Sequence, residues 1–176
     1  EYDRHGNCLV HTNPLGDQVR SSYDENDNKI TEQGPNPELT KRFYYDYMNR
    51  LIKVEEQHPD VVLSKHFKYD LCGNQTASID VYGKETCFEF DAFNRPIKVV
   101  APSVQNAEGD WIKPITKYGY DEMGNISSIT DPEGNVTRFR HTLYKKPYHI
   151  TYPDGSEERF EYDLQGNLVK EIAKNG

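Results

Sequence analysis

A Tyr-Asp pair recurs along the chain at near-constant spacing, and this period constrains the fold more than any other feature. The pairs are Tyr2-Asp3, Tyr23-Asp24, Tyr45-Asp46, Tyr69-Asp70, Tyr120-Asp121 and Tyr162-Asp163, with Phe90-Asp91 as a close variant and His141-Thr142 in a degenerate copy. The copies start at residues 2, 23, 45, 69, 90, 120, 141 and 162, most of them 21 residues apart. Repeats of this length indicate an array of small stacked units. We expect one array over residues 1–176, truncated at both ends.

A first turn is predicted directly after each Tyr-Asp pair. Four residues beyond each start stand Gly6, Asp27, Asn49, Gly73, Asn94, Gly124, Lys145 and Gly166. All but one are Gly, Asn or Asp, the residue types that tolerate a positive φ. The aspartate of the pair can accept hydrogen bonds from turn amides. The pattern therefore predicts a tight β-hairpin turn closed by a bulge.

A second turn is predicted fourteen residues after several of the starts. A glycine stands there in five copies, and in three of them a proline lies two residues earlier: Gly16, Gly83, Gly134, Gly155 and Gly176, with Pro14, Pro132 and Pro153. Such segments favour a tight turn. Where the second turn is lost, residues 33–39, 58–63 and 102–114 are expected to form longer loops.

Between the turns, the residues alternate as they do in β-strands. An aromatic residue stands two positions before most of the starts, which gives the pairs Phe43/Tyr45, Phe67/Tyr69, Phe88/Phe90, Tyr118/Tyr120, Phe139/His141 and Phe160/Tyr162. Period 2 places both members of a pair on one strand face. We predict an all-β antiparallel meander of about 16 strands, forming a curved, spiralling sheet. The aromatic pairs are expected to form one continuous buried ladder.

The repeat resembles the RHS or YD repeat. Residues 120–141 show the likeness best, through Tyr120, Asp121, Gly124, Asn125, Asp131, Pro132, Gly134 and Asn135. The resemblance extends over essentially the whole chain. It implies long β-sheet strips that spiral into a hollow shell. Bacterial members include polymorphic toxins, secretion-system effectors and the toxin-complex component that encloses a toxin, and animal teneurins use a similar shell in adhesion.

The resemblance also implies an autoproteolytic core region in bacterial members, with acidic residues involved. The string at residues 131–134 resembles the Asp-Pro signature of that region, but it stands at the ordinary second-turn position of the repeat. We therefore interpret the chain as a wall segment without protease or cargo. We expect it to be secreted or at the cell surface, a bacterial effector or toxin in preference to an animal surface protein.

The net charge, the apolar runs and the cysteines limit which partners, membrane spans and disulfide bridges are expected. The net charge is −8, so phosphate backbones would repel the chain and nucleic acid is not an expected partner. Apolar runs are only a few residues long, which predicts no membrane span. Cys8, Cys72 and Cys87 are interpreted as strand fillers, with a Cys72–Cys87 bridge as the alternative. The resemblance implies neighbouring repeats of the parent protein and an enclosed toxin polypeptide as partners.

Candidate chemistry is sparse. Asp24, Asn26 and Asn28 match the start of a calcium loop, but Lys29 replaces its glycine, so no metal site is expected. We predict no cofactor and no catalytic residue, because each acidic candidate has a turn role available. The leading function is a shell segment that encapsulates a toxin or other polypeptide. The alternative is an adhesion module that binds carbohydrate or a cell-surface partner.

Two further features stay open at this point. Trp111 lies in the 102–114 insertion and is either a loop contact residue or packed back onto the sheet. Three Asn-x-Ser/Thr triplets begin at Asn74, Asn125 and Asn135, where the repeat itself generates them; in a secreted animal protein they would be glycosylation sites.

Overall fold

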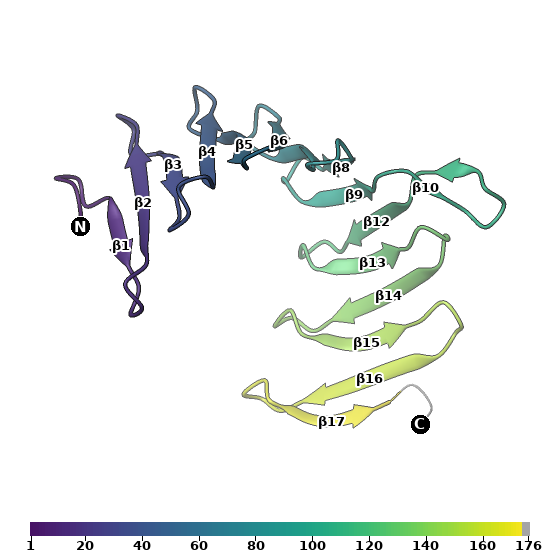
Figure 1. The fold of residues 1–176 in the computed structure, drawn as a ribbon. Helices are drawn as coiled ribbons and strands as arrows, with labels where there is room; N and C mark the ends of the chain where they lie inside the picture. The colour runs from purple at the N-terminus through teal and green to yellow at the C-terminus, as the bar shows by residue number, and fades with distance from the viewer. Residues whose placement is uncertain (174–176) are drawn as a thin grey trace. The chain divides into compact units, whose positions relative to one another are not determined.

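The chain is built entirely from strands and turns. In this computed structural model, residues 1–173 are described, and they form 17 β-strands and no helix (Figure 1). The prediction of an all-β antiparallel meander is confirmed. Contacts divide the chain into two compact units, residues 1–85 and 86–176. Within residues 1–173, no helix is long and apolar enough to cross a membrane.

In the first unit, each strand pairs antiparallel with the one before it. The strands are β1 (Val10–Thr12), β2 (Gln18–Tyr23), β3 (Lys29–Gln33), β4 (Thr40–Tyr45), β5 (Leu51–Gln57), β6 (Val62–Tyr69) and β7 (Gln75–Ile79). An isolated bridge between Tyr2 and Cys8 precedes them. This order is that of a simple meander with no crossover.

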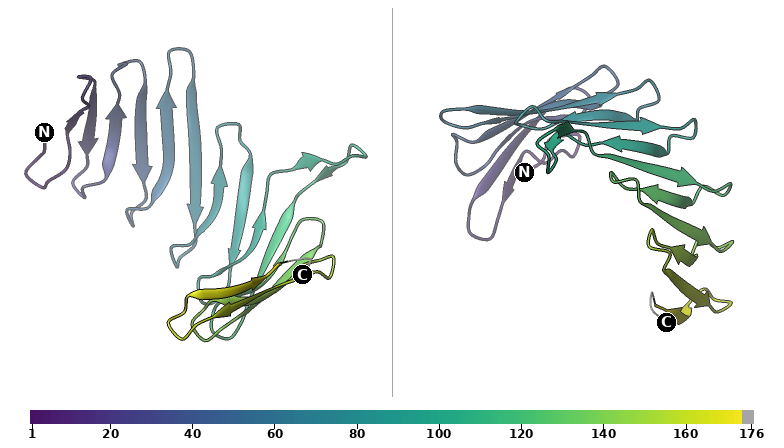
Figure 2. Two further views of the ribbon diagram at one scale, coloured as in Figure 1. Left: turned by 90° about the horizontal axis from the view of Figure 1, so that it is seen from below. Right: turned by 90° about the vertical axis from the view of Figure 1, so that its right-hand side faces the viewer.

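The second unit repeats the same plan with one excursion. Its strands are β8 (Glu85–Phe90), β9 (Pro96–Val100), β12 (Ile115–Tyr120), β13 (Ile126–Thr130), β14 (Val136–His141), β15 (Pro147–Thr151), β16 (Glu157–Tyr162) and β17 (Leu168–Ile172). Strand β9 pairs directly with β12, so β10 (Val104–Gln105) and β11 (Trp111–Ile112) leave the sheet as a separate hairpin. Within each unit the strands lie side by side in a single layer (Figure 2).

The first turns have the predicted geometry. In the turn of residues 121–125, the Gly124 amide donates to the Asp121 carbonyl at 3.0 Å, and the Asp121 amide donates to the Asn125 carbonyl at 2.9 Å. The pairing of β12 with β13 shifts register between Gly119 and Tyr120, which is the expected bulge. All eight residues that stand four positions after a repeat start have a positive φ. They include Lys145, whose φ is 60°.

Two of the three predicted loops differ from expectation. Residues 34–39 do form a loop between β3 and β4. By contrast, residues 58–63 are not a loop: strands β5 and β6 grow to 7 and 8 residues, and a turn bridged by the His58 amide and the Val61 carbonyl (2.9 Å) joins them. The 102–114 insertion forms the β10–β11 hairpin, because Asn106 and Gly109 rebuild the second turn at its tip. Gly176, predicted for another second turn, lies outside the described residues.

The continuous buried aromatic ladder is wrong in two respects. All its members are half-buried, and Ala77 is the one residue of 1–173 that is buried. The rings of successive repeats are also separated by the second strand of each hairpin, so that Tyr118 pairs with Ile129 and Phe139 with Ile150. The cause is the single layer, in which a face is shielded only by its own neighbours. Truncating one ring should therefore cost less than the about 3–5 kcal/mol typical of a fully buried aromatic.

Gly124 tests the turn geometry, because its φ is +82°. We predict that Gly124→Val lowers the free energy of unfolding by about 1–2 kcal/mol or more, since a β-branched residue is strained at positive φ. Gly34→Val is the matched control: Gly34 has no positive φ, and a Cβ there meets nothing within 4 Å. Denaturant titrations of both variants give the comparison. Equal losses would show that backbone conformation is not the reason for glycine at position 124.

Candidate functional site

The aspartate of each first turn holds that turn closed. The Asp121 Oδ1 atom accepts hydrogen bonds from the amides of Met123 (3.0 Å) and Asn125 (2.8 Å), and its Oδ2 atom accepts one from Asn125 Nδ2 (2.9 Å). The same carboxylate-to-asparagine contact recurs at Asp3, Asp24, Asp70 and Asp163, and in the second turn at Asp131. At Asp46 and Asp91, a guanidinium from Arg50 or Arg95 takes the place of the asparagine.

These bonds lower the pKa values of the turn carboxyls. The largest cause at each turn is the hydrogen bond from the residue four positions later, as from Asn28 to Asp24 or from Arg50 to Asp46. The affected groups are Asp3, Asp24, Asp46, Asp70, Asp91, Asp121, Asp131 and Asp163. Their role is structural, because both carboxylate oxygens are occupied by the turn.

The tyrosine of each pair connects one repeat to the preceding one. The Tyr120 hydroxyl donates a hydrogen bond to the Pro96 carbonyl at 2.7 Å, and the Tyr162 hydroxyl donates to the Pro147 carbonyl at 2.7 Å. In the first unit, Tyr23, Tyr45 and Tyr69 donate to the carbonyls of Cys8, Lys29 and Leu51 at 3.2, 2.9 and 2.9 Å. In each case the acceptor stands six residues after the start of the preceding repeat. The repeated tyrosine therefore links hairpins that backbone pairing alone would join only strand to strand.

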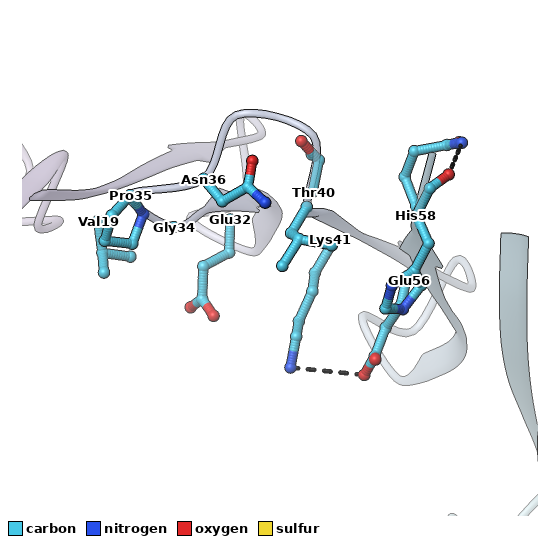
Figure 3. A pocket seen from close by; sticks show the side chains of 11 residues that line it. Val19, Glu32, Gly34, Pro35, Asn36, Thr40, Lys41, Glu56 and His58 are labelled. Atoms are coloured by element: carbon cyan, nitrogen blue, oxygen red, sulfur yellow. Dashed lines mark hydrogen bonds and ion pairs between the residues drawn. The ribbon is translucent and has the colours of Figure 1, made fainter. Parts of the chain in front are cut away.

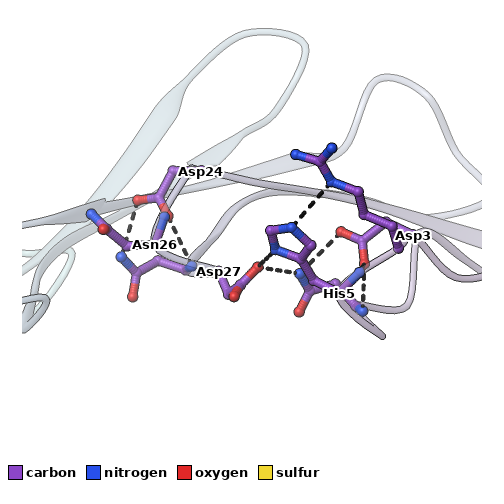
Figure 4. A network of polar contacts seen from close by, with 8 residues as sticks. Asp3, His5, Asp24, Asn26 and Asp27 are labelled. Atoms are coloured by element: carbon purple, nitrogen blue, oxygen red, sulfur yellow. Dashed lines mark hydrogen bonds and ion pairs between the residues drawn. The ribbon is translucent and has the colours of Figure 1, made fainter.

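The residue after the positive-φ position reaches forward to the next turn. Asn7 Nδ2 donates to Asp27 Oδ1 at 2.7 Å, where His5 Nδ1 also lies 2.9 Å away (Figure 4). Asn28 Nδ2 likewise donates to Asn49 Oδ1 at 3.0 Å. Where this residue is a cation, it lies over the ring of the next tyrosine: Arg50 over Tyr69 at 4.9 Å, Arg95 over Tyr120 at 4.3 Å and Lys146 over Tyr162 at 5.2 Å. Lys146 Nζ also contacts the Gly166 carbonyl.

The junction between the repeats that start at Tyr120 and His141 departs from this pattern. His141 carries no hydroxyl, and its Nδ1 atom is buried without a hydrogen-bond partner. The turn that follows is capped by the Thr142 hydroxyl, which accepts from the amides of Tyr144 and Lys146 at 3.3 Å. These contacts are longer than those made by the aspartate caps, and this junction also lacks the hydroxyl link that Tyr120 and Tyr162 make.

The fold is shared with solved toxin-complex proteins. The structures of TcdB2-TccC3-Cdc42 and of TcdB2-TccC3 without its hypervariable C-terminal region each superpose with a TM-score of 0.75, at 15% identity over 95% of this chain. A Photorhabdus luminescens Tc holotoxin pore with a mutated TccC3 gives 0.51 at 14% identity over 98% of this chain. The chain spans 10% to 13% of the length of these proteins. The fold that the resemblance to RHS/YD repeats predicts is therefore confirmed.

Sequence comparison adds one relative. Double-stranded DNA deaminase toxin A of Burkholderia cenocepacia (strain H111) is 38% identical over 61 residues, which is 35% of this chain and 4% of that protein. No family model matches the chain. A 61-residue stretch of the chain is thus similar to part of a toxin. The solved structures, at 14% to 15% identity, show the fold alone.

One edge of the first unit is hollowed. The cavity, of about 260 Å³, opens where the 34–39 loop replaces the second turn, and Figure 3 shows Glu32, Lys41, Glu56 and His58 at its wall. Both of these carboxylates are engaged: Glu56 pairs with Lys41 at 3.4 Å, and Glu32 pairs with Lys29 at 2.8 Å. Both lining carboxylates are therefore paired with cations. The described residues of the lining include no pair of free carboxylates for acid–base chemistry.

The other residues singled out in the sequence are Trp111, the three cysteines and the asparagines of the Asn-x-Ser/Thr triplets. Trp111 is 70% exposed on β11, so it does not pack back onto the sheet, and its contact role stays a prediction. Cys8, Cys72 and Cys87 are free thiols. Among residues 1–173, no group of three or more His, Cys, Asp and Glu side chains could hold a metal ion. The side-chain amides of Asn74, Asn125 and Asn135 each donate to a turn aspartate.

The hydroxyl link predicts opposite effects of two substitutions. Tyr162→Phe should lower the free energy of unfolding by about 0.5–1.5 kcal/mol, since the Pro147 carbonyl loses its donor. His141→Tyr should raise it by a similar amount, because the hydroxyl restores the repeat pattern. Tyr144→Phe, at a ring 79% exposed on a turn tip, is the control and should change little. Thermal and urea denaturation measure all three, and a Tyr162→Phe effect as small as the control would refute the link.

The turn carboxyls predict a loss of stability in acid. A carboxyl whose folded pKa is lowered stabilises the fold at pH values above its unfolded pKa of about 3.9. That contribution declines as the pH falls below about 5 and is lost once the pH passes below the folded pKa. Urea titrations between about pH 7 and pH 2 should show a plateau followed by this decline, accompanied by proton uptake on unfolding, because the unfolded carboxyls bind protons at a higher pH than the folded ones. Stability that stays constant down to about pH 2 would contradict the capping role.

Proposed function

We propose that the chain is an RHS-repeat array that forms a wall segment of a shell that encloses a polypeptide, with the aromatic face turned toward the cargo. The aromatic face consists of the Phe/Tyr/His pairs named above together with Ile97, Val99, Ile129 and Ile150 of the second unit. One observation carries the proposal: this face is rich in half-buried apolar side chains, with Glu158 and Glu171 as acidic members, yet no second layer of described residues within either unit covers it. Compact domains usually cover such a face with a second packed layer.

The opposite face has the character of a solvated exterior. On it, Lys98 pairs with Glu89 at 2.7 Å and Lys170 pairs with Glu161 at 3.2 Å. Exposed pairs of this kind contribute about 0–1 kcal/mol each to stability, so they serve solubility more than folding. One face thus suits water, and the other suits an apolar content.

An aromatic lining also suits a cargo of variable sequence. Ring faces contact aliphatic, aromatic and cationic side chains without a fixed donor and acceptor pattern. A wall with such a face would hold an incompletely folded polypeptide without recognising a particular sequence. The toxin relative makes a toxin polypeptide the proposed cargo, the parent protein a secreted bacterial toxin or effector, and other repeats of that parent the lateral neighbours. Catalysis is then a property of the cargo, and the wall itself performs none.

A photo-crosslinking experiment in the full-length protein tests this proposal. Phe139 and Arg140 are neighbours in β14 whose side chains lie on opposite faces of the sheet. A benzoylphenylalanine at position 139 should crosslink to the enclosed polypeptide, whereas the same group at position 140 should not. Crosslinks from position 140 alone, or from neither position, would refute the inward orientation. Binding on a glycan array that Phe139→Ala abolishes would instead support the carbohydrate-binding adhesion module.

A further inference from the structure

The first-turn edge of the second unit carries a row of exposed apolar side chains. Its four turns span residues 91–95, 121–125, 142–146 and 163–167, and they lie at the same edge because every second strand ends there (Figure 1). We call their large apolar side chains the turn-tip row: Phe93 (78% exposed), Met123 (51%), Leu143 (80%), Tyr144 (79%) and Leu164 (97%). An apolar series of this kind, set on an otherwise polar edge, marks an interaction surface.

Turn geometry does not require these residues. The turn needs a capping side chain at its first position and a residue that tolerates positive φ at its fourth, while the two tip positions point outward. The second turns of the same unit show this, because their tips are Pro132-Glu133 and Pro153-Asp154. The first-turn edge is therefore apolar for a reason other than folding.

The tips of the first two turns are also held by their aspartate caps. The Phe93 amide donates to Asp91 Oδ1 at 2.8 Å, and the Met123 amide donates to Asp121 Oδ1 at 3.0 Å. These caps fix the backbone on both sides of the two tips before any partner arrives, whereas the tip of the third turn is held by the longer contacts of the Thr142 hydroxyl. Binding through preorganised tips avoids the entropy of ordering a loop.

We propose that the turn-tip row docks edge to edge with the same row of a second copy of this chain. Neighbouring first turns are two strands apart, so the tips recur about every 9.5 Å. A partner meets all four tips only if it has the same period, which an identical edge supplies by construction. Of the eight tip residues, only Glu122 is charged, so two copies can approach here despite a net charge of −8 each.

A two-fold arrangement gives this contact a defined register. In a two-fold dimer the same surface is used by both copies, so that if one residue of the first copy contacts a second residue of the other copy, the reverse contact is also made. An axis through the middle of the row exchanges the second turn with the third and the first with the fourth. Glu122 of one copy then lies beside the exposed Lys145 of the other, and Phe93 lies beside Leu164. The inference concerns this edge only and does not depend on what the aromatic face encloses.

Analytical ultracentrifugation of the chain tests the proposal. We expect concentration-dependent dimerisation that weakens at least tenfold in the double variant Leu143→Ser/Tyr144→Ser. The matched control is Leu15→Ser/Tyr82→Ser, which removes side chains 88% and 83% exposed at second-turn tips of the first unit and should leave dimerisation unchanged. Circular dichroism melting verifies that both variants fold. A monomer at every concentration, or dimerisation that only the control variant weakens, would overturn the proposal.

A charge-reversal pair tests the register separately. Glu122→Lys should weaken dimerisation by placing two cations together, and adding Lys145→Glu to the same chain should restore it. In a background with Cys8, Cys72 and Cys87 replaced by serine, Phe93→Cys/Leu164→Cys should form an intermolecular disulfide under oxidation. Failure of both the rescue and the crosslink in a chain that still dimerises would overturn the two-fold register.

Discussion

The hydrogen bond from each repeated tyrosine to a carbonyl of the preceding repeat is the interaction on which the array depends most. A hairpin repeat in one layer cannot bury its own face, so neighbouring repeats have to be joined by more than the backbone ladder. The phenol supplies this join with its hydroxyl on the carbonyl and its ring on the sheet. At Tyr69, Tyr120 and Tyr162 a cation of the preceding repeat covers that ring as well. The two residues of the Tyr-Asp pair thus have different roles: the aspartate closes its own turn, and the tyrosine binds a carbonyl of the preceding repeat.

Stability distributed in this way explains how the array can do without a core. Polar contacts at the turns and half-buried rings on the strands take the place of a packed interior, and each repeat contributes a similar small amount. An isolated domain would gain little from such a plan, because a large apolar face stays open. A wall gains from it, because its length can grow by repeats while its inner face stays apolar and its outer face stays charged. The apolar turn tips of the second unit belong to neither face, which is why we propose an edge contact for them.

The sequence predicted the turns well and the burial poorly. Positive-φ positions and aspartate caps are local requirements, so Gly124 and Asp121 could be assigned from their residue types and spacing. Burial of Phe139 depends on whether a second layer exists, which no local pattern reveals, and the ring proved half-buried. The β10–β11 hairpin was missed although its turn, Asn106-Ala107-Glu108-Gly109-Asp110, repeats the Asn-x-x-Gly-Asp of residues 13–17. The acceptor of the tyrosine hydroxyl was also missed, because it stands in another repeat and is a backbone atom without a sequence signal.

An electron cryo-microscopy structure of the full-length protein would test the central claim most directly. The account predicts that the aromatic face of this segment lines an enclosed volume, that density for polypeptide lies within reach of Phe139 and Ile150, and that the face carrying Arg140 meets solvent. A structure in which the aromatic face meets bulk solvent, or packs against a folded domain outside any enclosed volume, would contradict it.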